Sequence, residues 1–84
     1  MAKANALNAM AAGKAFGLLW GAAILLVGLL GMNGGYGVEF VEVMGSVYPG
    51  YEMTTNGVLV GTVWGLIDGF IAGWVFAWLY NKFV

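Results

Sequence analysis

The sequence contains no cysteine and no histidine, and it carries little charge. These absences exclude disulfides, thiolate chemistry, the usual zinc sites and histidine-ligated haem or chlorophyll. The only basic residues, Lys3, Lys14 and Lys82, are too few for a nucleic-acid-binding patch. Charged residues make up 8% of the 84 residues, against about 25% in soluble domains. Water is therefore a poor solvent for this chain, and the lipid bilayer is the natural alternative.

The sequence also lacks the residue combinations that are typical of enzymes. It has no arginine and no pair of carboxylates that would share a pocket. Glu39 and Glu42 fit the solvated face of a helix, and no recognisable base is present to activate a serine or threonine. We therefore expect no catalytic activity, no cofactor and no metal site.

Two long apolar runs dominate the residues that are present. Residues 15–32, AFGLLWGAAILLVGLLGM, carry no charge, and residues 57–80 carry one. A membrane-spanning helix needs about 20 apolar residues, so both runs predict transmembrane helices. Residues 1–14 form an N-terminal segment that can extend the first helix, and residues 81–84 form a tail. The alternative for the first run is a secretory signal peptide.

An acidic connection, residues 33–56, joins the two runs. Glu39, Glu42 and Ser46 lie at helical spacing among valines, which favours a short helix at the membrane surface over a β-hairpin. Pro49 and Gly50 predict a turn. The predicted fold class is an all-α membrane protein, a two-helix transmembrane hairpin with a structured, partly helical extracytoplasmic loop.

The orientation of the hairpin follows from its lysines, which lie toward both ends of the chain. The positive-inside rule places both termini in the cytoplasm and the connection on the other side of the membrane. Tryptophan and tyrosine prefer the headgroup level. The candidate interfacial anchors are Trp20, Tyr48, Tyr51, Trp74, Trp78 and Tyr80.

Glycine recurs at every fourth position of the second run. The row comprises Gly57, Gly61, Gly65, Gly69 and Gly73, continued by Ala77, and the first run has a shorter row of Gly13, Gly17 and Gly21. Glycine lets helix backbones approach closely in lipid. The two rows can pack on each other within one hairpin, but we also expect a homo-oligomer or docking onto a larger membrane complex. Gly65→Leu or Gly69→Leu should then break association, whereas Val58→Leu should not.

Asp68 is an acid near the centre of the second run. A charged aspartate at that depth costs roughly 2.5–3.5 kcal/mol on insertion scales, and no basic residue is expected at its level. The candidate hydrogen-bond partners are Thr62, backbone carbonyls exposed beside glycines, the Trp20 N–H group, or Asp68 of another copy. Asp68 can act as a protonated contact between helices, as an ion or proton site that lines a pore, or as the partner of a cation from another subunit.

The loop SVYPGY and the segment GTVWGLIDGFIAGWVFAWLYNKF resemble short two-helix bacterial membrane proteins commonly labelled bacteriophage holins. The resemblance covers most of the chain from Ala15 onward and includes Trp64, Gly65, Asp68 and Gly69. It implies a multi-pass protein of the bacterial inner (cytoplasmic) membrane that oligomerises there and makes lesions that release a cell-wall-degrading enzyme. We therefore expect a self-associating, holin-like and pore-forming protein.

Two alternatives remain open for the function. The first is an accessory subunit of a larger membrane complex, which would use the small-residue rows for docking. The second is a proton- or ion-translocating ring subunit, because Asp68 is similar in place to the carboxylate of the c subunit of rotary ATP synthases. The chain departs from that subunit in its long acidic loop, and its glycine row lies on the other helix.

Overall fold

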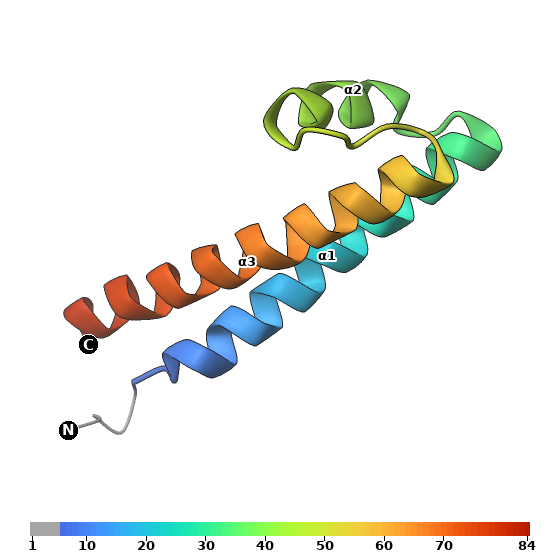
Figure 1. Cartoon of the computed structure of the whole chain (residues 1–84). Coiled ribbons are helices and arrows are strands. Elements are labelled where there is room, and N and C mark those ends of the chain that lie inside the picture. Colours follow the sequence, from blue (N-terminus) through green and yellow to red (C-terminus); the bar gives the residue numbers. More distant parts are fainter. Residues whose placement is uncertain (1–5) are drawn as a thin grey trace.

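The computed structural model describes residues 6–84, and this part of the chain contains three helices (Figure 1). Helix α1 spans Ala9–Gly34, α2 spans Val38–Val47 and α3 spans Thr55–Phe83. α1 and α3 lie side by side as an antiparallel hairpin, with α2 in the connection between them. At the open end, Leu7 N–H donates to the side-chain oxygen of Asn81 over 2.8 Å, and the Asn81 amide donates back over 2.9 Å.

The two long helices begin and end at recognisable caps. The Asn8 side chain accepts a hydrogen bond from Ala11 N–H, and the Thr54 hydroxyl accepts one from Gly57 N–H. α1 ends where Gly35 adopts a positive φ of 73°. Both helices are therefore longer than the predicted spans of 15–32 and 57–80, and the first one includes part of the predicted N-terminal segment. Lys3 lies outside the described residues.

α1 and α3 are long and apolar enough to cross a membrane. Only 28% of the residues in the most apolar 18-residue window of each helix are buried, so most of their large apolar side chains face outward. A soluble protein rarely exposes contiguous apolar surface on this scale. The all-helical hairpin with two candidate membrane-spanning helices therefore indicates a membrane protein.

The glycine rows of α1 and α3 face each other within the hairpin. A Cβ atom built on Gly69 would lie 2.6 Å from the Phe16 carbonyl oxygen and 2.8 Å from the Gly17 Cα atom. The buried small residues are Gly13, Gly17, Gly21, Gly28, Gly31, Gly57, Gly61, Gly65, Gly69, Gly73 and Ala77. Gly13, Gly17, Gly21, Gly65, Gly69 and Gly73 lie against the opposite long helix, whereas Gly57 and Gly61 lie against Glu52 and Tyr51 of the connection. An intact hairpin therefore leaves these glycines no room to accept a helix of another chain.

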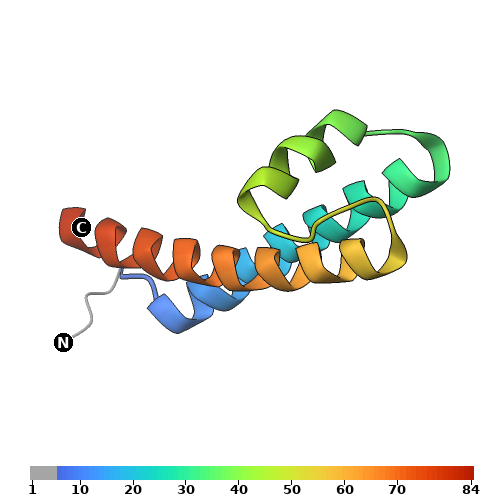
Figure 2. The same cartoon turned by 45° about the horizontal axis from the view of Figure 1, so that its top comes forward.

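α2 is helical, but it does not stand apart from the hairpin. Figures 1 and 2 show it alongside the half of the hairpin that is far from the chain ends. A Cβ on Gly37, just before α2, would lie 2.6 Å from a Val27 methyl group, whereas Tyr48, just after α2, is hydrogen-bonded to Trp20. The connection therefore folds back along α1, and its end at Tyr48 reaches the middle of that helix. The sequence predicted a short helix in this connection, and its position at the membrane surface stays a prediction.

A small core holds the connection against the long helices. Ile24, Val41, Tyr48 and Tyr51 are each at most 3% exposed. Residues 48–51 form a β-turn in which Tyr51 N–H donates to the Tyr48 carbonyl and Gly50 has a φ of 91°. The Trp64 indole N–H donates to the Pro49 carbonyl over 2.9 Å. The predicted Pro-Gly turn is thus present, and it packs directly on α3.

Candidate functional site

The Asp68 carboxylate is held by a hydrogen-bonded chain that joins three parts of the fold. The Tyr48 hydroxyl, in the turn after α2, donates to Asp68 on α3. The same hydroxyl accepts a hydrogen bond from the Trp20 indole N–H on α1 over 2.8 Å. The Tyr48 ring also stacks on Trp64, with ring centroids 6.1 Å apart and planes inclined by 7°. The acid at the centre of α3 is therefore tied to both of the other helical segments.

Tyr48 is buried, and its environment keeps the phenol protonated. Burial raises the pKa of Tyr48, and the hydrogen bond to Asp68 raises this pKa further, while the hydrogen bond from Trp20 lowers it. A neutral phenol has one O–H to donate, and Tyr48 directs it to Asp68. Among residues 6–84, Tyr48 is the one hydrogen-bond donor to this carboxylate.

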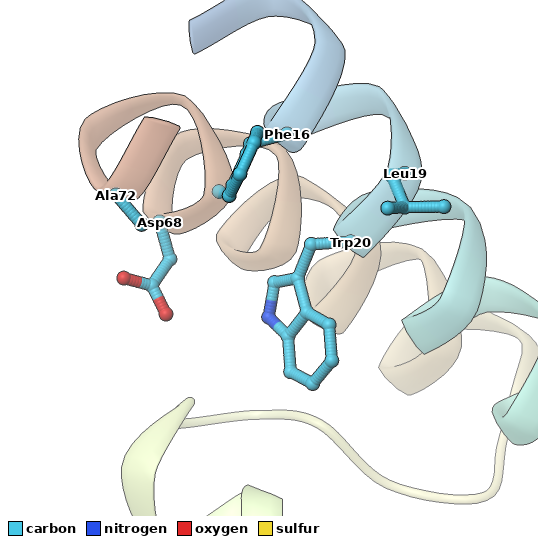
Figure 3. A pocket seen from close by; sticks show the side chains of 6 residues that line it. Phe16, Leu19, Trp20, Asp68 and Ala72 are labelled. Atoms are coloured by element: carbon cyan, nitrogen blue, oxygen red, sulfur yellow. The ribbon is translucent and has the colours of Figure 1, made fainter. Parts of the chain in front are cut away.

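Two hollows flank Asp68. The first has a volume of about 340 Å³ and is lined by Phe16, Leu19, Trp20, Asp68, Gly69 and Ala72. Figure 3 shows Asp68 and Trp20 extending from α3 and α1 to the same side, with the indole nitrogen toward the carboxylate. The second hollow, about 200 Å³, is lined by Val47, Tyr48, Trp64, Ile67, Asp68 and Ile71. Asp68 is accordingly exposed, and apart from Tyr48 it borders open space with apolar walls.

The partners found for Asp68 differ from those that the sequence suggested. The Trp20 N–H reaches the acid only through Tyr48, and the Thr62 hydroxyl donates to the Val58 carbonyl instead. Sequence reasoning missed Tyr48 as a partner, since it placed this tyrosine at the headgroup level. The Pro-Gly pair at residues 49 and 50 predicted where the chain reverses. No local pattern predicted that this turn packs against the middle of the long helices.

The six candidate anchors fall into two groups. Tyr48 and Tyr51 face the interior and are 3% exposed, and Trp20 is partly buried against their cluster. The two tyrosines lie among the helices, whereas Trp20 also lines the hollow beside Asp68. In contrast, Trp74, Trp78 and Tyr80 are exposed toward the end of α3, where Lys82 Nζ lies 4.8 Å from the centre of the Trp78 ring. For the second group the role of interfacial anchor stays a prediction.

Comparison with known protein families, with curated proteins and with solved structures finds no match. Residues 6–84 contain no group of three or more acidic, histidine or cysteine side chains that could hold a metal ion. The site is thus a single carboxylate, Asp68, held by Tyr48 and bordered by apolar hollows. A carboxylate in this setting suits the binding of a cation or of a hydrogen-bond donor from another molecule.

Proposed function

We propose that the chain is a small integral protein of the bacterial cytoplasmic membrane that assembles with copies of itself and permeabilises the membrane, as holins do. The exposed carboxylate of Asp68, at the middle of a candidate spanning helix, carries this proposal. A charged aspartate facing lipid costs roughly 2.5–3.5 kcal/mol on insertion scales. A neighbouring chain that covers the hollows beside Asp68 removes the acid from lipid.

The glycine rows are not the surface of this assembly, because the hairpin already buries them against the opposite long helix or against the connection. The side faces of the hairpin remain for contact with another copy. They carry large apolar side chains that include Leu18, Leu19, Val63 and Ile67, all exposed in a single chain. In lipid, such faces associate through close packing and polar contacts rather than through the hydrophobic effect. Asp68 supplies the polar contact on one of these faces.

Self-assembly and permeabilisation can be tested together. We expect native mass spectrometry in mild detergent to show oligomers of one chain type, and we expect liposomes with the protein to release a trapped dye. A strict monomer that leaves the vesicles tight would refute both parts of the proposal. Recovery of the chain in a fixed ratio with a different membrane protein would instead support the role of an accessory subunit.

The proposed orientation places both described ends in the cytoplasm. The hydrogen bonds between Leu7 and Asn81 bring these ends together, and Lys82 lies at the same end of the hairpin. Because the chain has no cysteine, single-cysteine variants report position without background. In intact spheroplasts, a membrane-impermeant maleimide should label Tyr36→Cys, at the far end, and should label Phe83→Cys only after permeabilisation. The reverse pattern would show the opposite orientation.

A further inference from the structure

The hairpin carries an acid and a base on opposite side faces. Asp68 borders a hollow that contains Phe16 and Trp20, while Lys14 borders a separate hollow formed by Gly13, Lys14, Gly17, Leu18, Leu66 and Phe70. The two hollows share no residue. With about 3.6 residues per turn, Lys14 and Leu18 lie on one flank of the glycine row of α1, and Phe16 and Trp20 lie on the other. The α1–α3 contact therefore separates the two charges.

Lys14 and Asp68 nevertheless lie at similar levels along the hairpin. Gly13 and Gly17, on either side of Lys14, both pack on Phe70: a Cβ on Gly13 would lie 3.0 Å from its carbonyl oxygen, and one on Gly17 would lie 3.2 Å from its nitrogen. Phe70 follows Asp68 by two positions. Lys14 is thus displaced from Asp68 by about one helical turn, or about 5 Å along the axis. The four-carbon side chain of lysine can bridge such a displacement.

Neither charge has an ionic partner within the part of the chain that is described. Residues 6–84 form no ion pair with Lys14 or with Asp68, and both residues lie inside candidate spanning helices. A lone charge at membrane depth is costly, whereas attraction between opposite charges is stronger there than in water. Lys14 and Asp68 could therefore neutralise each other, but within a single hairpin they lie on opposite faces.

We propose that neighbouring copies pack side by side in the same orientation, with Lys14 of one copy paired to Asp68 of the next. The proposal rests on the self-assembly proposed above and specifies its contact. A second copy is the occupant that matches both hollows at once, because each copy offers one acid and one base at similar levels. Since the two faces differ, the contact is heterologous and repeats from copy to copy until a ring closes. Apolar residues beside each charge, such as Leu18 and Trp20, complete the packing.

Cross-linking between two single-cysteine variants tests the arrangement. Leu18→Cys marks the Lys14 face and Ala72→Cys marks the Asp68 face. With a short bis-maleimide, a mixture of the two variants in one membrane should give cross-linked dimers, while each variant alone should give almost none. Equal cross-linking of each variant with itself would show that like faces meet, and this result would overturn the proposal.

Exchange of the two charges tests the pairing itself in the same cross-linking assay. Lys14→Gln should lower the yield of the mixed dimer about tenfold or more, because it leaves Asp68 buried without a counter-charge. Lys14→Glu combined with Asp68→Lys should restore the yield. Leu59→Val should not alter it, because Leu59 is an exposed residue of α3 that lines none of the hollows beside Lys14 or Asp68. Lys14→Gln does not touch the Tyr48–Asp68 hydrogen bond, and circular dichroism verifies that each variant remains helical.

The results of these experiments distinguish the Lys14–Asp68 contact from self-assembly in general. Oligomers that persist without the mixed cross-link, or that ignore the loss of Lys14, would overturn the Lys14–Asp68 contact and leave self-assembly intact. A monomeric protein would overturn both. If a lipophilic cation or a lipid headgroup occupies the Asp68 hollow instead, the charge exchange will fail to restore the cross-link, which also counts against the proposal.

Discussion

Replacing Gly69 by leucine should separate α1 from α3. Even the first atom of the new side chain would lie 2.6 Å from the Phe16 carbonyl oxygen and 2.8 Å from the Gly17 Cα atom, which are both backbone atoms. A rotamer change cannot relieve such a clash, so one helix must move away from the other. Overpacking typically costs 1–3 kcal/mol, and we expect a destabilisation of about 3 kcal/mol because close packing is the main force between helices in lipid.

The separation can be measured as a distance between spin labels at Met10 and Leu79, near the open end of the hairpin. In Gly69→Leu the distance distribution should shift to longer values and broaden, and the protein should unfold at a lower concentration of denaturing detergent. Val63→Leu is the matched control, because this valine on α3 is 56% exposed. Equal distance distributions in the two variants would mean that the glycine contact does not hold the hairpin together.

The second large effect is expected for Tyr51→Ala. The Tyr51 ring lies against Gly61 and is 3% exposed, and its hydroxyl donates to the Ile24 carbonyl over 2.8 Å. Truncation of a buried aromatic residue costs about 3–5 kcal/mol, since a cavity replaces the ring. The lost contacts join the turn at residues 48–51 to Ile24 on α1 and to Gly61 on α3, while the hydrogen bonds of Tyr48 and Pro49 remain. We therefore expect the connection to detach from the hairpin more often while α1 and α3 stay paired.

Hydrogen exchange in lipid nanodiscs should register this detachment as faster exchange over α2 and the following turn. Tyr36→Ala is the control, because Tyr36 is 66% exposed in the same connection. Tyr51→Phe keeps the ring and removes only the hydroxyl, so it should cost about 1 kcal/mol. Unchanged exchange in Tyr51→Ala would show that the ring does not hold the connection in place.

Local sequence pattern does not identify every buried residue of α3. From the sequence alone, Val58→Leu is expected not to disturb helix association. In the structure, however, Val58 is 1% exposed, and its methyl groups lie against Gly28. The fourfold glycine spacing identifies one line of contact on α3. It cannot reveal that a residue beside this line is also buried, because that depends on the angle at which α1 crosses and on the course of the connection.

The sequence by itself determined the two apolar helices, the short helix between them, the Pro-Gly turn and the close approach of helices along the glycine rows. These features follow from composition and from spacings within a few residues, where helical periodicity acts directly. Only the tertiary structure decided that the glycine rows meet within one chain, that Tyr48 reaches Asp68, and that Lys14 lies near the level of this acid on the opposite face. Those relations depend on the antiparallel register of α1 and α3 and on how far the connection folds back. Both are fixed by contacts between residues that are distant in the chain, and no local spacing encodes them.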